Sequence, residues 1–143
     1  MGTLGQVVIG GILPAILWGV TAIIQKLSAQ QGAPPGHYLA AFGAVICASG
    51  LLYSSLTRGA TIQGPGIALA ALAGVTFSFG TGLISFALWK FGTPISRLAP
   101  VLSGNVLVTV LIGMTFLHET LPPLRLIGGT VLIVGGVILV SLA

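Results

Sequence analysis

Long apolar stretches separated by short polar connections dominate this sequence. Five of them are long enough to cross a bilayer: Val7–Ile24, Tyr38–Leu56, Gly66–Leu88, Ile95–Leu117 and Leu124–Leu142. At a rise of about 1.5 Å per residue, about 20 residues span a hydrocarbon core of about 30 Å. Barrel strands are about half that length and alternate in polarity, whereas these segments do not. The pattern therefore predicts an all-α integral membrane protein with five transmembrane helices.

The connections between these stretches are short and carry residues that end helices. Pro34-Pro35-Gly36 follows the first stretch, and Gly92-Thr93-Pro94 separates the third from the fourth. Proline cannot continue a helix, and helices joined so tightly run antiparallel to their sequence neighbours. We therefore expect a single five-helix domain over residues 1–143. Pro100 should kink the fourth helix or open its hydrogen-bond ladder, and Pro14 should do so more mildly in the first.

Charged side chains are scarce. They make up 4% of the residues, against roughly 25% in an ordinary soluble domain. The formal charge of +4 reflects a lack of acids, because the chain has five Lys and Arg and one acidic residue. No basic cluster exists, so we expect no nucleic-acid partner. Met1–Gln6 has no Lys or Arg, so the first stretch is expected to be a permanent span rather than a cleaved signal peptide.

Catalytic and metal-binding patterns are missing from the sequence. His118-Glu119 is the one pair that suggests chemistry, but adjacent helical residues do not share a face. Glu119 is the single acid, and His37 lies in a distant loop, so neither a carboxylate pair nor a metal ligand set can form. We expect no enzyme activity, no metal and no cofactor. Cys47 is the single cysteine and leaves no partner for an intramolecular disulfide.

Polar side chains inside membrane spans are costly and often mark a functional pathway. In the first helix, Trp18, Thr21 and Gln25 share one face by their spacing, with Lys26 just beside it. Trp18 lies too deep for the interfacial belt where Trp usually sits. We interpret this face as the lining of a substrate cavity, with helix packing as the alternative. Lys26 could equally extend its amine to the lipid headgroups.

The third and fourth helices carry further candidates. Ser78, Thr81 and Ser85 share a face of the third helix, where hydroxyls can contact a substrate or bond to their own helix carbonyls. Asn105 is the only Asn and lies mid-span in the fourth helix, with Thr109 one turn later. An amide at that depth needs partners, so we interpret Asn105 and Thr109 as substrate contacts, with helix–helix hydrogen bonding as the alternative.

Small residues form stripes that allow helix backbones to approach closely. On the third helix they recur every four residues and predict packing within the chain. On the fifth helix two glycine pairs repeat at seven residues and predict packing within the chain or between two chains. The third-helix residues are Gly66, Ala70, Gly74, Ser78 and Gly82; the fifth-helix residues are Gly128, Gly129, Gly135 and Gly136.

These motifs, in this order, resemble the EamA domain of the drug/metabolite transporter superfamily. The resemblance covers nearly the whole chain and is clearest from about Ala71 onward. It is carried by Trp18-Gly19, Asn105-Val106 through Gly113, Leu117-His118-Glu119, Leu126-Ile127-Gly128 and Gly135. It implies one five-helix half of what is usually a ten-helix transporter made of two inverted halves.

The chain departs from relatives in three ways. The second helix lacks the arginine that many carry, and Val106 stands where many have proline. Small multidrug resistance relatives use a first-helix glutamate for proton-coupled export of cations, and no such acid exists here. The cationic mechanism therefore does not carry over, and neutral, zwitterionic or anionic metabolites or a lipid headgroup remain as substrates.

Loop charges are balanced between the two sides. Lys26, Lys90 and Arg97 fall on one side, and Arg58, Arg125 and the free amino terminus fall on the other. Because Lys and Arg in short loops set orientation, this balance permits insertion both ways. An antiparallel homodimer requires that freedom and would supply the second inverted repeat. A parallel homodimer, a heterodimer or a piece of a longer protein are the alternatives.

The sequence thus predicts a multi-pass protein of the cell membrane that moves a small organic solute by alternating access. The first alternative is a lipid-linked carrier or flippase subunit, and the second is a non-transporting partner of another membrane protein.

Overall fold

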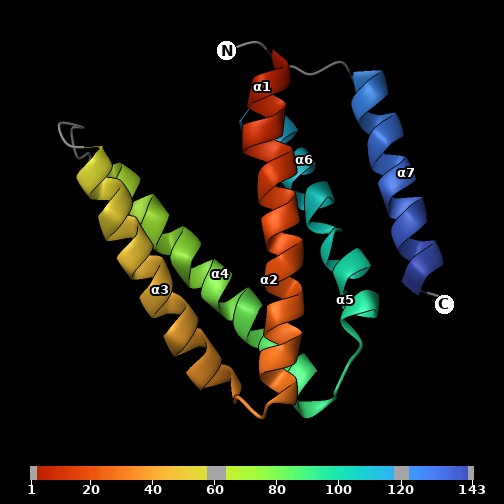
Figure 1. Cartoon of the computed structure of the whole chain (residues 1–143). Coiled ribbons are helices and arrows are strands. Elements are labelled where there is room, and N and C mark those ends of the chain that lie inside the picture. Colours follow the sequence, from red (N-terminus) through yellow and green to blue (C-terminus); the bar gives the residue numbers. More distant parts are fainter. Residues whose placement is uncertain (1–2, 58–63, 118–122, 142–143) are drawn as a thin grey trace. The chain divides into compact units, whose positions relative to one another are not determined.

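The computed structural model describes residues 3–57, 64–117 and 123–141, and in these ranges the chain forms helices and no strands (Figure 1). The predicted all-α fold is confirmed. In chain order the elements are α1 (Thr3–Val7), the π-helix η1 (Val8–Ile12), α2 (Leu13–Gln30), α3 (Pro35–Leu56), α4 (Gly64–Lys90), α5 (Ile95–Leu102), α6 (Asn105–Thr115) and α7 (Pro123–Ser141).

The described helices include four that are long and apolar enough to cross a membrane: Leu4–Gln30, Pro35–Leu56, Gly64–Lys90 and Ile95–Thr115. Within α7 a shorter apolar helix covers Gly128–Val140. Large apolar side chains are exposed along these elements, for example Leu51, Leu69 and Leu132. Such extensive apolar surface is not stable in water, so it needs lipid or another protein to cover it.

The backbone hydrogen-bond pattern of the first span changes next to Pro14. The Leu13 N–H donates to the carbonyl of Val8, five residues earlier, which makes the turn before Pro14 a π-helix. Proline has no N–H, and its ring clashes with the carbonyl four residues before it. The expected mild opening at Pro14 therefore takes the form of one π-helical segment, η1.

The fourth span is interrupted, and the break lies after Pro100 rather than at it. α5 contains Pro100 and ends at Leu102, and α6 starts at Asn105. Between them the Gly104 N–H donates to the Val101 carbonyl at 3.0 Å. This hydrogen bond joins residues three apart, whereas an α-helical hydrogen bond joins residues four apart. A Cβ on Gly104 would lie 3.0 Å from that same oxygen, so a larger residue would fit only if the neighbouring backbone shifted by a few tenths of an ångström. The predicted break in this helix is confirmed.

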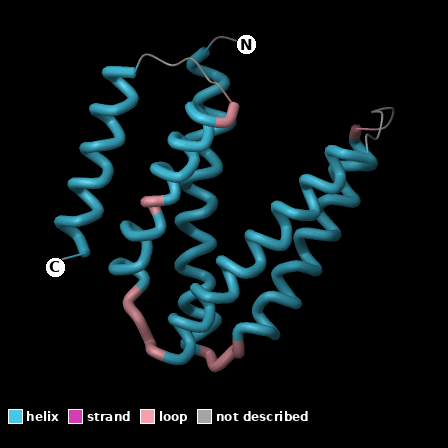
Figure 2. The backbone as a smooth tube through the Cα atoms, turned by 180° about the vertical axis from the view of Figure 1, so that it is seen from behind, coloured by secondary structure: helices cyan, strands magenta, loops and turns pink. Residues whose placement is uncertain are grey.

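The chain divides into two compact units, Met1–Gly92 and Thr93–Ala143, which we describe separately. In the first unit α3 and α4 lie side by side (Figures 1 and 2). α2 packs mainly on α4, close to the short link into α3, and diverges from the α3–α4 pair toward its own N-terminal end. The described buried side chains of this unit are Gln25, Ser85 and Leu88.

The small-residue stripe of the third span brings helices together at one end. A Cβ on Gly82 of α4 would lie 3.2 Å from Leu39 Cδ1 of α3, which marks a close approach. Equivalent Cβ positions on Gly66 and Gly74 have no described atom within 4 Å. Within the described chain the predicted packing is therefore seen at Gly82 and not at Gly66 or Gly74.

In the second unit α7 packs on α5. The half-buried side chains of α7 include Thr130, Val134 and Val137, which share one face of the helix at spacings of four and three residues. This face defines the side of α7 that is covered by its own unit.

Candidate functional site

A buried polar contact joins α2 to α4. Gln25 Nε2 donates to Ser85 Oγ at 2.8 Å and to the backbone carbonyl of Thr81 at 3.3 Å. Gln25 is 7% exposed and Ser85 is 4% exposed. The structure thus brings together three residues that the sequence singled out on two helices. In this arrangement the Gln25 amide donates to the neighbouring helix, which is the packing alternative for that side chain.

Lys26, the next residue, reinforces the same junction. Its Nζ donates to the carbonyl of Gly92 at 3.0 Å, just past the end of α4. Gly92 has a φ of +62°, a left-handed conformation that glycine adopts without strain after a helix. A cation beside the C-terminal end of a helix is also favoured by the helix dipole. Gln25 and Lys26 together fix the end of α2 to the end of α4.

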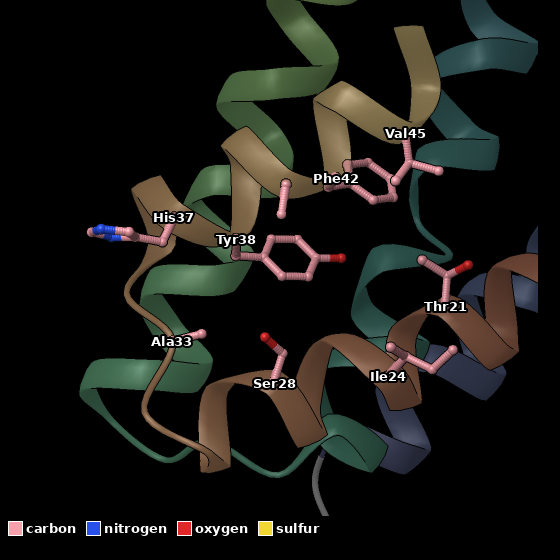
Figure 3. Close-up of a pocket in the computed structure, with 9 residues that line it drawn as sticks. Thr21, Ile24, Ser28, Ala33, His37, Tyr38, Phe42 and Val45 are labelled. Atoms are coloured by element: carbon pink, nitrogen blue, oxygen red, sulfur yellow. The ribbon is translucent and has the colours of Figure 1, made fainter. Parts of the chain in front are cut away.

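A pocket of about 460 Å³ opens between α2 and α3, next to this junction (Figure 3). Ligand pockets in proteins typically measure about 300–1,000 Å³. Residues one helical turn apart on each of the two helices supply most of its walls. They are Thr21, Ile24 and Ser28 from α2, Ala33 from the link, and His37, Tyr38, Ala41, Phe42 and Val45 from α3.

Two hydroxyls point into this pocket without a partner in the described chain. The oxygens of Ser28 and Tyr38 project into the open space, and neither makes a hydrogen bond with a described residue (Figure 3). Thr21 differs, because its hydroxyl donates to the Leu17 carbonyl of its own helix at 2.9 Å and its methyl faces the pocket. His37 belongs to the rim and directs its ring away. The pocket is therefore apolar with two available hydroxyls.

Aromatic stacking holds one wall of the pocket in place. The rings of Tyr38 and Phe42 stack at a centroid distance of 5.6 Å, and Phe42 stacks on Phe77 of α4 at 6.2 Å. Such pairs contribute about 0.5–1.5 kcal/mol beyond the area that they bury. The stack orients the Tyr38 hydroxyl and ties α3 to α4. It gives the pocket a rigid aromatic side.

Ser28, Tyr38 and Phe42 were not predicted as site residues from the sequence. Tyr38, Ala41, Phe42 and Val45 do follow the spacing of one helical face, which was the available signal. Because nearly every position of α3 is apolar or small, that face does not stand out from the others. The contact with α2 distinguishes this face of α3 from the other faces.

Two other predicted residues of the first unit lie elsewhere. Trp18 is 69% exposed on α2, one turn before Thr21, and does not line the pocket. Ser78 lines a second, smaller pocket of about 280 Å³ between α3 and α4, whose other walls are Leu39, Phe79, Gly82 and Leu83. That Trp18 and Ser78 contact a substrate remains a prediction.

Asn105 and Thr109 belong to the second unit. Asn105 is the first residue of α6, directly after the break in the fourth span, and its side chain is exposed. The Thr109 hydroxyl donates to the backbone carbonyl of Asn105 at 3.1 Å. The break at Ser103–Gly104 thus determines where the Asn105 amide is presented. Its role as a substrate contact stays a prediction.

Two of the four glycines of α7, Gly128 and Gly135, lie opposite its half-buried face, and Gly129 and Gly136 lie to one side of it. At about 100° per residue, Gly128 and Gly135 point roughly 140–160° away from Thr130, the centre of the covered face. No described atom lies within 4 Å of a Cβ built on Gly128, Gly129, Gly135 or Gly136. Leu132, on the same side, is 78% exposed. Within the described residues this glycine face has no packing partner.

Comparisons with known proteins assign no relative. No family model, curated protein sequence or solved structure matches this chain.

Proposed function

We propose that this protein is a multi-pass protein of the cell membrane that moves small organic solutes by alternating access. In this proposal it is a single five-helix form of the EamA domain, and two copies assemble as an antiparallel homodimer. The length and apolar character of its helices, together with their exposed apolar side chains, support insertion in a bilayer.

The observation that carries the proposal is the α2–α3 pocket. A purely structural membrane protein has no need for two unpaired hydroxyls in a space of about 460 Å³ between two apolar helices. Polar groups without partners are costly in an apolar medium, so they are best explained by a ligand that satisfies them.

The arrangement of the first unit also supports alternating access. α2 is fixed to α4 by Gln25 and Lys26 at one end and diverges from the α3–α4 pair toward the other (Figures 1 and 2). A pair of elements held at one end can rock about that end. The α2–α3 pocket lies beside the fixed end, so small changes in the angle of α2 would change its opening.

Assembly from two copies is supported by α7 and by the loop charges. The glycine face of α7 allows the close backbone approach that helix association in membranes requires. The balance of Lys and Arg between the two sides permits opposite insertions. Two oppositely oriented copies would provide the inverted repeats on which such transporters are built.

A lipid-linked carrier or flippase subunit is the second candidate function. It is favoured by the position of the pocket between two helices whose side chains outside the pocket, such as Ile23 and Ile46, are exposed and apolar. A groove with such flanks is accessible to the apolar tail of a lipid-linked molecule. A non-transporting partner role remains the outcome if neither solutes nor lipids move.

The test is flux in proteoliposomes that contain the purified full chain. Labelled neutral, zwitterionic and anionic metabolites would be followed alongside a dye-labelled short-chain phospholipid. We expect saturable, protein-dependent flux of at least one solute. Ala41→Phe, which fills the pocket, should abolish it. Ala40→Phe should not, because Ala40 is exposed on the same helix and lines neither pocket.

Movement of the phospholipid alone would favour the flippase subunit. Absence of both activities in a folded, reconstituted protein would contradict transport and favour the non-transporting partner.

A further inference from the structure

We infer that the α2–α3 pocket binds an uncharged amphipathic molecule, an alcohol or phenol with an apolar body. This inference names the substrate class of the proposed carrier and so rests on the proposed function. It combines three properties of the pocket: its lack of charge, its two available hydroxyls and its apolar walls.

The lining carries no formal charge that could select an ion. None of its nine residues is Lys, Arg, Asp or Glu, and the His37 ring points away from the space. Lys26 is close in sequence, but its amine already donates to the Gly92 carbonyl at the end of α4. An ion that left water for this apolar space would lose its hydration without gaining a counter-charge. The pocket therefore favours a neutral ligand.

The two hydroxyls determine the polar part of that ligand. Ser28 and Tyr38 can each donate one hydrogen bond and accept others, and neither is occupied by the described chain. A ligand hydroxyl also donates and accepts, so a single group can satisfy both side chains at once. An ether can only accept, and a hydrocarbon can do neither. Alcohols and phenols are therefore preferred over their capped analogues.

The remaining walls determine the apolar part. Ile24 and the Thr21 methyl form the α2 side, and Val45 with the Tyr38 and Phe42 rings forms the α3 side. A space of about 460 Å³ accommodates one aromatic ring with a short alkyl chain. Offset stacking on Phe42 or Tyr38 favours a ring over a purely aliphatic body. A short-chain alkylphenol combines these features.

The experiment measures binding to the full chain in phosphatidylcholine nanodiscs by calorimetry, with empty nanodiscs as the reference for partition into lipid. The probes are 4-propylphenol, 4-propylanisole and 4-propylbenzoate, which present a hydroxyl, an ether and an anion on the same body. We expect saturable binding of 4-propylphenol, weaker binding of 4-propylanisole and no saturable binding of 4-propylbenzoate.

Matched variants assign the binding to the pocket. Tyr38→Phe keeps the stacked ring and removes one hydroxyl, so it should weaken 4-propylphenol binding about two- to tenfold, the value of one neutral hydrogen bond. Tyr53→Phe is the control, because Tyr53 lies on the same helix, is exposed and does not line the pocket. Ala41→Phe should abolish saturable binding. Circular dichroism verifies that each variant keeps its helices.

Three results would overturn the inference: tighter binding of 4-propylbenzoate than of 4-propylphenol, partition into lipid without saturation, or equal effects of Tyr38→Phe and Tyr53→Phe. Its failure is distinguishable from failure of the proposed function. Flux of other solutes without binding of 4-propylphenol overturns the ligand class and leaves transport standing. Pocket-dependent binding without flux of any solute supports the ligand class and overturns transport.

Discussion

The side-chain amide of Gln25 in α2 donates a hydrogen bond of 2.8 Å to the hydroxyl of Ser85 in α4. Both side chains are almost fully buried. Sixty residues of chain separate them, so this contact exists only because α2 folds onto the last turns of α4. It lies at the end of the first unit where α2, α3 and α4 come together, beside the pocket.

The Gln25–Ser85 contact should be a stabilising element. Ser85→Ala leaves the buried Gln25 amide with one partner fewer, and we expect a loss of about 1–3 kcal/mol in the free energy of unfolding. Gln25→Leu should cost less, because the Ser85 hydroxyl can bond to a carbonyl of its own helix. Unfolding by SDS in mixed micelles measures these differences.

A double-mutant cycle separates this contact from general packing. If Gln25 and Ser85 interact directly, the double variant should lose less than the sum of the two single losses. Ser49→Ala provides the control, because the Ser49 hydroxyl bonds to the Val45 carbonyl of its own helix and is exposed. Full additivity of the two losses would argue against the contact.

Lys26 and Lys90 should differ sharply although both lie near helix ends. Lys26→Met removes a hydrogen bond to the Gly92 carbonyl and a cation at the C-terminal end of α4. We expect a loss of about 1 kcal/mol in the free energy of unfolding. Lys90→Met removes a cation from the same helix end but no hydrogen bond to a described residue, so it should cost clearly less. Equal losses would show that charge near the junction matters and the specific bond does not.

Gly104 should tolerate substitution worse than a glycine in open space. Gly104→Ala places a Cβ 3.0 Å from the Val101 carbonyl oxygen, so the turn between α5 and α6 must shift, at a cost of about 1–3 kcal/mol. Gly43→Ala in α3 meets no described atom within 4 Å and should stabilise the helix by up to about 1 kcal/mol. Thermal unfolding in detergent compares the two. A stabilising Gly104→Ala would show that the turn absorbs the extra methyl group without strain.

The glycine face of α7 should mediate self-association. Gly128→Leu and Gly135→Leu overfill a face that its own unit leaves open, so we expect weaker dimerisation with unchanged helicity. Val134→Leu is the control on the opposite, half-buried side of α7 and should affect stability rather than association. Energy transfer between labelled copies in bilayers measures dimerisation. Wild-type association in both folded glycine variants would exclude this face as the interface.

The orientation of the chain tests the antiparallel arrangement. Because Lys and Arg are balanced between the two sides, C-terminal reporter fusions should be active on both sides of the membrane. One or two lysines added to a single set of loops should fix one orientation. A wild-type protein inserted in one direction only is incompatible with an antiparallel homodimer.

Local physics made much of the fold predictable. Long apolar segments must close their own backbone hydrogen bonds, so the sequence alone determined that the chain is helical and where the helices lie. Proline effects are equally local: η1 comes just before Pro14, and the fourth span was expected to be interrupted because it contains Pro100. The close approach of the Val101 carbonyl to Gly104 was not predicted from the sequence.

The partners of the polar side chains were decided by tertiary structure. The spacing of Trp18, Thr21 and Gln25 placed them on one face, yet Trp18 is exposed, the Thr21 hydroxyl bonds within α2, and Gln25 is buried against α4. Spacing gives an angle around the helix axis and does not say which neighbour occupies that direction. The Tyr38 hydroxyl was not predicted to point into a pocket for the same reason. When every face of a helix is apolar or small, no contrast in polarity marks the inward one, and only the packing of α2 on α3 and α4 selects it.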